Sequence, residues 1–109
     1  MRRSRIGALR HRLRLEAPVR TSTEGGAATE TWVEVATLFA SLVPRAGRES
    51  FEAHAHRGEH VFDVRFRYRP TVTTDMRLVL GDRIFNILSV ADEGERRRWT
   101  HCTAREVTR

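Results

Sequence analysis

Apolar and charged side chains alternate with a period of two along residues 9–15 and 62–68. Because successive side chains of a β-strand point to opposite faces, each stretch predicts a strand with one core face and one exposed face. Ala17-Pro18 is expected to end the first strand and Pro70 the second, since proline cannot donate to a sheet ladder. The exposed faces carry two rows of arginine, Arg10, Arg12 and Arg14 in the first and Arg65, Arg67 and Arg69 in the second.

Four further strands follow from apolar, β-branched and aromatic runs. Residues 32–43 are apolar on both parities, which is typical of a central strand covered on both faces, although the Ala and Leu of the second half also allow a helix. Residues 76–80 and 83–90 are expected to form a hairpin, because Gly81-Asp82 between them suits a type II′ turn. A last strand is expected within residues 96–107.

Turn signals separate these strands. Residues 21–28, with Gly25-Gly26 at their centre, predict a hairpin connection, and residues 91–95 predict another turn. Six short strands with such turns indicate an all-β fold, a small six-stranded antiparallel barrel or sandwich. The 109-residue length suits a single domain over residues 1–109.

The segment from Pro44 to His60 interrupts the pattern and fits neither a strand nor a helix period well. It predicts a long loop between the second and third strands, and a turn of helix around Glu49 to Ala55 is also compatible with the sequence. Ordering a loop costs about 1–2 kcal/mol per residue in backbone entropy. We therefore expect this segment to be mobile in a free subunit and to be ordered by neighbouring subunits.

The same segment contains a histidine group, His54, His56 and His60, in the spacing H-x-H-x3-H. Two histidines at alternate strand positions share a face and could bind zinc, but no fixed fourth ligand is evident. We favour solvated loop residues, and we expect no metal and no cofactor.

The net charge and the catalytic residue types do not point to one function. All 20 basic residues are arginine, against 14 acidic residues, which gives a formal net charge of +6. The arginine rows could contact phosphates, pair with acidic residues of neighbouring subunits, or form solvated faces that block edge aggregation. Neither a nucleophile setting around Ser41, Ser50, Ser89 or Cys102 nor a glycine-rich phosphate loop is visible, so no enzyme activity is expected.

The chain gives no sign of a membrane protein or of a disulfide framework. No apolar run reaches the roughly 20 residues of a membrane helix. Arginines interrupt what would be the apolar part of a signal peptide, so we expect an intracellular product without a membrane partner. Cys102 is the only cysteine, which precludes an internal disulfide and suggests a small buried strand residue.

Several short segments occur in a specific order, although none of them is diagnostic alone. They are residues 5–13 (RIGALRHRL), 32–40 (WVEVATLFA), 44–49 (PRAGRE), 64–70 (VRFRYRP), 76–78 (MRL), 83–87 (RIFNI) and 90–93 (VADE). In this order, and over nearly the whole chain, they resemble the head-to-tail joining or head-closure (stopper) proteins of long-tailed bacteriophages, including relatives in phage-derived gene transfer agents.

The resemblance implies a compact β-barrel subunit in the neck of a phage or phage-like particle, made in the bacterial cytoplasm. It implies a homo-oligomer, a dodecameric ring with the adaptor and portal ring above it and the tail terminator ring below it. Such a ring closes the head around packaged double-stranded DNA and docks the tail. It implies no catalysis.

In such proteins the long segment after the second strand can project toward the channel. The resemblance therefore places residues 44–60 near the DNA, with Arg45, Arg48, His54, His56 and Arg57 as the candidate channel-facing residues. Relatives more often have Gln, Ala or Thr where this chain has its histidines. The two arginine rows are the expected intersubunit or ring-to-ring contacts.

Two alternatives remain open from the sequence. One is a free-standing basic β-barrel that binds nucleic acid, for which the net charge of +6 is the main support. The other is a metal-dependent enzyme that uses the three histidines, which would require stoichiometric zinc.

Overall fold

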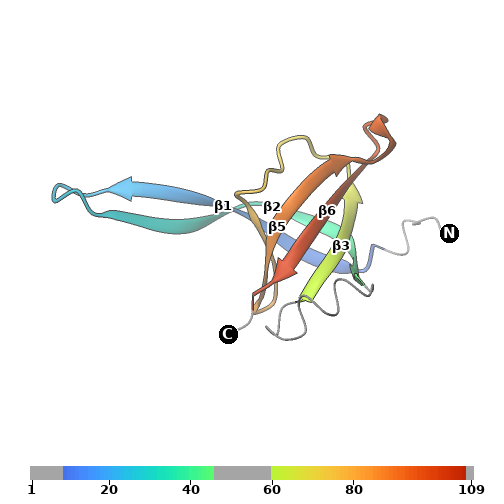
Figure 1. Ribbon diagram of the computed structural model, residues 1–109, viewed down its shortest axis with the longest axis horizontal. Helices are drawn as coiled ribbons and strands as arrows, with labels where there is room; N and C mark the ends of the chain where they lie inside the picture. The colour runs from blue at the N-terminus through green and yellow to red at the C-terminus, as the bar shows by residue number, and fades with distance from the viewer. Residues whose placement is uncertain (1–8, 46–59, 108–109) are drawn as a thin grey trace.

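A computed structural model of the chain describes residues 9–45 and 60–107. Its elements are β1 (His11–Ser22), β2 (Ala28–Pro44), β3 (His60–Arg67), β4 (Arg77–Leu80), β5 (Arg83–Asp92), a short 3-10 helix η2 (Glu93–Glu95) and β6 (Trp99–Glu106). The strands pair antiparallel in the order β1-β2-β3-β6-β5-β4, and β4 also pairs with β1, so the sheet closes (Figure 1). The predicted six-stranded antiparallel fold is confirmed.

Apolar side chains of the inward parity fill the closed sheet. Leu13 in β1, Phe66 in β3 and Phe85 in β5 are each at most 1% exposed. The rings of Phe62 and Phe85 meet edge to face with centroids 5.3 Å apart, a geometry favoured by the ring quadrupoles. The alternation read along residues 9–15 and 62–68 is therefore the alternation between core and solvent.

Cys102 lies fully buried in β6, as its sequence context suggested. Burial disfavours the thiolate and raises the pKa of this thiol to about 12. The group is consequently an unreactive part of the core.

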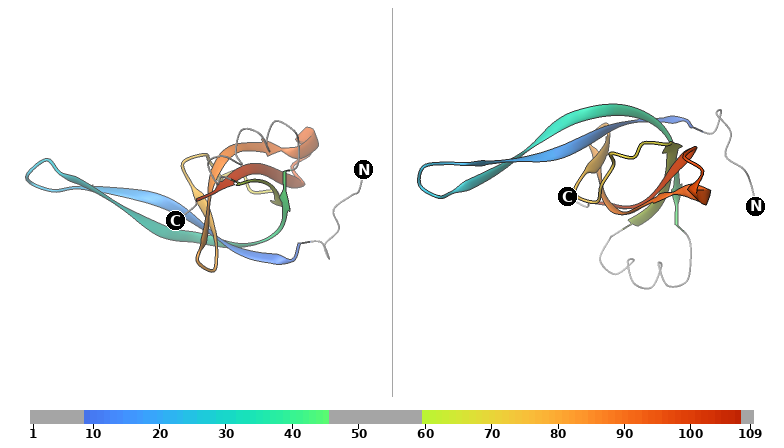
Figure 2. Two further views of the ribbon diagram at one scale, coloured as in Figure 1. Left: turned by 60° about the horizontal axis from the view of Figure 1, so that its bottom comes forward. Right: turned by 90° about the horizontal axis from the view of Figure 1, so that it is seen from above.

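The hairpin of β1 and β2 extends beyond the closed sheet as a two-stranded arm, defined here as residues 16–34 (Figures 1 and 2). The pairing register shifts between Leu15 and Glu16, and such a bulge bends and twists a strand pair. At the tip, the backbone N–H of Thr23 donates to the carbonyl of Ala27 at 2.8 Å. The predicted hairpin connection over residues 21–28 is confirmed, and the arm accounts for the long 54 Å dimension of the molecule.

The expectation that Ala17-Pro18 ends the first strand is wrong. β1 continues to Ser22, and Pro18 pairs with Trp32 of β2. The cause is the short β4, which pairs with β1 only at Arg14–Glu16. Beyond that point β1 pairs only with β2 and is an edge strand. A proline is tolerated on an edge strand, because a backbone N–H that points to the open edge has no partner in the sheet.

The expectation that residues 32–43 form a strand covered on both faces is also wrong for the single subunit. β2 is a strand, not a helix, and it buries Leu38 and Ala40. Its other parity leaves Val35, Phe39 and Val43 between 52% and 58% exposed. A sheet that closes on itself has one interior, so every strand keeps one outer face.

The β4–β5 hairpin has the predicted turn. Leu80 pairs with Arg83, and Gly81 between them has a φ of 63°. Among the described non-glycine residues only Glu95 and Arg97 have positive φ, so Asp82 does not, and this combination is that of a type II′ turn. The last strand begins at Trp99, which leaves residues 96–98 in the preceding turn.

Candidate interaction surfaces

The first arginine row lies on the outer face of β1, as its parity predicts. Arg12 is opposite Phe39 and Arg14 is opposite Thr37 across the β1–β2 pair. The Nε of Arg14 is 3.6 Å from a carboxylate oxygen of Glu16 and 4.0 Å from one of Glu34. Within the described residues Arg10 and Arg12 have no such carboxylate partner, so their guanidinium groups are available for contacts with other molecules.

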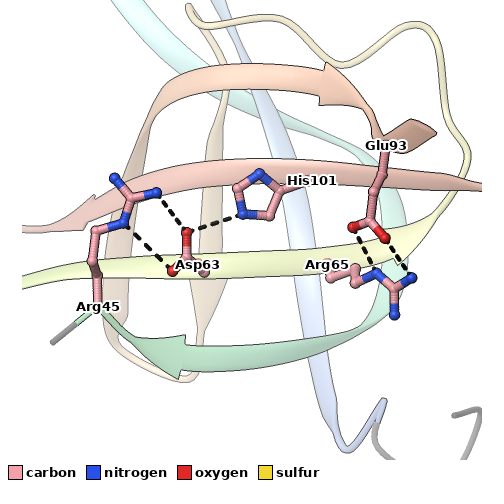
Figure 3. A network of polar contacts seen from close by, with 5 residues as sticks. All are labelled: Arg45, Asp63, Arg65, Glu93 and His101. Carbon is pink, nitrogen blue, oxygen red and sulfur yellow. Dashed lines mark hydrogen bonds and ion pairs between the residues drawn. The ribbon is translucent and has the colours of Figure 1, made fainter. Parts of the chain in front are cut away.

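The second arginine row is divided by its local contacts. Arg65 donates two hydrogen bonds to the carboxylate of Glu93, at 2.8 and 2.6 Å (Figure 3). Its guanidinium carbon lies 4.3 Å from the centroid of the Trp99 ring. Arg67 is exposed and lies 5.1 Å from the same centroid. Of this row, Arg65 is held within the subunit and Arg67 faces outward.

Arg69, the third member of the row, lies beyond the end of β3 and is only partly exposed. Its backbone N–H donates to Thr100 Oγ1 at 2.9 Å. Its side-chain Nε is buried without a hydrogen-bond partner among the described residues. A buried guanidinium nitrogen of this kind costs free energy until an acceptor reaches it.

Arg45 belongs to a polar cluster at the end of β2 (Figure 3). Its Nη2 lies 3.1 Å from Asp63 Oδ1, and His101 Nε2 lies 3.0 Å from the same oxygen. These side chains come from the end of β2, from β3 and from β6, and they hold the point where the chain leaves the barrel toward residues 46–59. Sequence reasoning selected Arg45 but missed Asp63 and His101, because only the β3–β6 register brings residues 38 positions apart together.

The other channel-facing candidates, Arg48, His54, His56 and Arg57, lie outside the described residues and stay predictions. His60 is the exposed first residue of β3. Among the residues that the structure describes, no group of three or more His, Cys, Asp or Glu side chains is arranged to hold a metal ion. The same part of the chain contains no helix long and apolar enough to cross a membrane.

Two further ion pairs tie strands together. Arg77 of β4 donates to Glu16 at 2.8 Å, and its guanidinium carbon lies 4.1 Å from the Trp32 ring centroid, at the root of the arm. Arg83 donates two hydrogen bonds to Glu106, at 2.8 and 3.0 Å. This pairing lowers the pKa of Glu106 and raises that of Arg83, because each hydrogen bond favours the charged form.

Apolar side chains are exposed along β2 and on the arm. Val35, Phe39 and Val43 share one parity of β2 and form what we call the β2 stripe. Beside Phe39 lies a hollow of about 510 Å³, lined by residues 37–39 and 66–69 together with Leu9. A single exposed apolar residue is ordinary, but three of them on one face of a strand, beside a hollow, are typical of a site that binds another molecule.

Comparisons with known proteins give one family match and two similar solved structures. The family model of phage head completion proteins matches residues 4–107. A chain from the virion of a native gene transfer agent particle is 25% identical, with a TM-score of 0.66, over 91% of this chain and 96% of that one. Protein SF1141 from Shigella flexneri 2a, solved in solution, is 25% identical with a TM-score of 0.71, over 94% and 96%. No significant match occurs among curated proteins.

Proposed function

This chain belongs to the phage head completion protein family, and we propose that it is the neck subunit that closes the DNA-filled head and docks the tail. The family and the likeness to a gene transfer agent virion chain make it a structural protein of a phage or phage-like particle. The finer proposal concerns its place: a homo-oligomeric ring, dodecameric by family analogy, between the adaptor and portal ring and the tail terminator ring.

The observation that carries the proposal is the likeness to the virion chain over 91% of this sequence. A match of that extent covers the body of the protein and not one shared motif. Because a fold alone does not determine function, the family match over residues 4–107 provides the second support.

The outer surface supports a role in binding proteins. The β2 stripe presents apolar side chains to solvent. Covering such a surface with a partner removes apolar area from water and so favours association. A free-standing nucleic-acid-binding barrel is less well supported, because Arg45, Arg65 and Arg83 are each paired with a carboxylate of the same subunit. An arginine held in this way has less to offer to a phosphate.

Residues 44–60 are proposed to face the channel and to meet the packaged DNA. Arg45 stands at the described end of this segment and is paired with Asp63 in the free subunit, so its own contact to a phosphate requires that this exposed pair opens. Arg48 and Arg57 are the other candidate arginines of the segment. The ring would thereby hold the DNA in the head by contacts to the phosphate backbone, which require no base sequence.

Electron microscopy of particles made without this protein tests the proposal. We expect DNA-leaking heads without tails, and we expect that the full-length chain supplied in trans restores filled and tailed particles. Normal tailed particles that retain their DNA would contradict a function in head closure.

A further inference from the structure

The inner face of the barrel continues into the arm, where the subunit does not cover it. Leu15, Ala17 and Val19 follow one another on one parity of β1, and Val33 lies opposite Ala17. Leu15 is 1% exposed, whereas Val19 and Val33 are 44% and 49% exposed. A two-stranded ribbon with a bare apolar face is at best marginally stable in water, so this face is suited to a partner.

The arm and the barrel carry opposite charges. Residues 16–34 contain four glutamates and one arginine, a net charge of −3. The barrel residues that the structure describes, 9–15, 35–45 and 60–107, contain thirteen arginines and seven acidic residues, a net charge of +6. A surface that complements the arm in charge is therefore present on the same chain.

The hollow beside Phe39 provides a matching surface. Phe39 is 58% exposed, Arg12 lies opposite it on β1, and Arg67 lines the hollow on its other side. The unpartnered Nε of Arg69 belongs to a residue that lines the same hollow. The alternation across the β1–β2 pair places Ala17, Val19 and Val33 on one face of the arm and Glu16, Glu30 and Glu34 on the other. An apolar centre such as Phe39 suits the first of these faces.

The arm of the same subunit cannot fill this site, because it points away from the barrel in every view (Figures 1 and 2). An arm that reaches a neighbouring copy forms a head-to-tail contact, and such contacts repeat around a ring when the rotation closes. The occupant that fits by its net charge and by its apolar face is thus a second copy of this chain.

We propose that the apolar face of the arm of one subunit, with Ala17, Val19 and Val33, lies over Phe39 and the adjoining hollow of the next subunit. This inference rests on the proposed function as a ring-forming subunit. It assigns the contact between neighbours to two defined surfaces, the apolar face of the arm and the Phe39 site.

Engineered cysteines test the contact in assembled particles. A chain with Val33→Cys and Phe39→Cys should, after oxidation, yield a ladder of disulfide-linked subunits on a non-reducing gel. Cys102 does not compete, because it is fully buried with a pKa raised to about 12. The control pairs Val33→Cys with Leu88→Cys, an exposed position on β5, and should stay monomeric. Completed particles in which the first variant also stays monomeric would overturn the inference.

Polar substitutions on the two apolar surfaces provide a second test that needs no disulfide geometry. Val19→Ser with Val33→Ser in the arm should lower the yield of completed particles at least about tenfold, the equivalent of about 1.4 kcal/mol of contact energy. Phe39→Ser at the site should do the same. Leu88→Ser, at an exposed position on β5, is the matched control and should leave the yield unchanged. Equal yields for all of these variants would contradict the contact.

The outcomes separate this inference from the proposed function. If particles without the protein leak DNA but neither the cysteine pair nor the polar substitutions have an effect, the function stands and the arm contact is wrong. If particles without the protein are normal, head closure itself is wrong.

Discussion

The barrel and the arm are built from the same two strands, yet they hold their apolar side chains differently. On the inner parity, Leu13 and Leu38 in the barrel are at most 7% exposed, whereas Val19 and Val33 in the arm are 44% and 49% exposed. Backbone pairing between β1 and β2 is continuous through both regions except at the bulge. The two regions therefore differ in whether the rest of the subunit packs against these side chains. We infer that the barrel is stabilised by its own core, whereas the arm requires a partner for its stability.

The side-chain contacts that stabilise the arm are stronger at its root than along its length. The root of the arm is held by Arg77, which donates to Glu16 and lies over Trp32. Farther out, the Arg20–Glu30 pair at 3.4 Å is exposed to solvent. Exposed pairs contribute little, typically about 0.2–1 kcal/mol, so the arm is fixed at its root far more firmly than along its length.

The largest expected effect is in the barrel core. Phe85→Ala should lower the free energy of unfolding by about 3–5 kcal/mol, because it removes a fully buried ring and leaves a cavity against Phe62. Urea unfolding of the free subunit measures this loss. Phe39→Ala, at an exposed site, should change the same quantity by less than about 0.5 kcal/mol. Equal losses would break the comparison between covered and uncovered side chains.

The second effect concerns the root of the arm. Arg77→Ala should lower the free energy of unfolding by about 1–3 kcal/mol, because the largely buried carboxylate of Glu16 loses its hydrogen bond from Arg77 and keeps only the longer contact with Arg14. Arg20→Ala is the matched change on the exposed part of the arm, and we expect less than about 0.5 kcal/mol. Thermal unfolding of both variants compares them, and a larger loss for Arg20→Ala would refute the assignment of the root.

The third effect compares two turns. Gly81→Ala should cost about 1 kcal/mol, because Gly81 has a φ of 63° that residues with a Cβ avoid. Gly25→Ala at the tip of the arm should be close to neutral, since a Cβ there meets no atom within 4 Å and its φ is not positive. Unfolding midpoints in urea provide the measurement, and a neutral Gly81→Ala would exclude a strained turn.

The smallest effect is a pH dependence in the barrel. The hydrogen bonds from Arg83 lower the pKa of Glu106 below the ordinary value of 4.5. The pair therefore stabilises the fold at pH values above 4.5, and this contribution is lost as the pH falls through the lowered pKa. Glu106→Gln should remove less than about 1 kcal/mol at pH 7, and the difference from the unchanged chain should shrink in acid. A difference that grows on acidification would contradict the assignment.

The local patterns predicted the strands but not the arm. The alternation along residues 62–68 and the Gly81-Asp82 turn depend on neighbours in sequence, so they could be read directly. Pro18 was misleading because its tolerance depends on where β4 stops pairing with β1, which is a tertiary property. The sequence likewise gave no sign that Glu93 pairs with Arg65, 28 residues away.

The most instructive error is β2. Its apolar residues on both parities predicted a strand covered on both faces, and the single subunit leaves Phe39 and Val43 exposed. Periodicity reports which side chains avoid water but not whether the cover comes from the same chain or from another one. The proposed contact between neighbours would supply the cover over Phe39 that the pattern indicates.

Hydrogen exchange of the full-length chain, free and within assembled particles, tests most directly whether the arm becomes stably paired only when a partner covers it. Amides of residues 17, 19–22 and 28–33 should exchange rapidly in the free subunit and at least about tenfold more slowly in the particle. Amides of β3 and β6 should be protected in both and serve as the internal reference. Equal exchange of the arm in the two states would contradict the account.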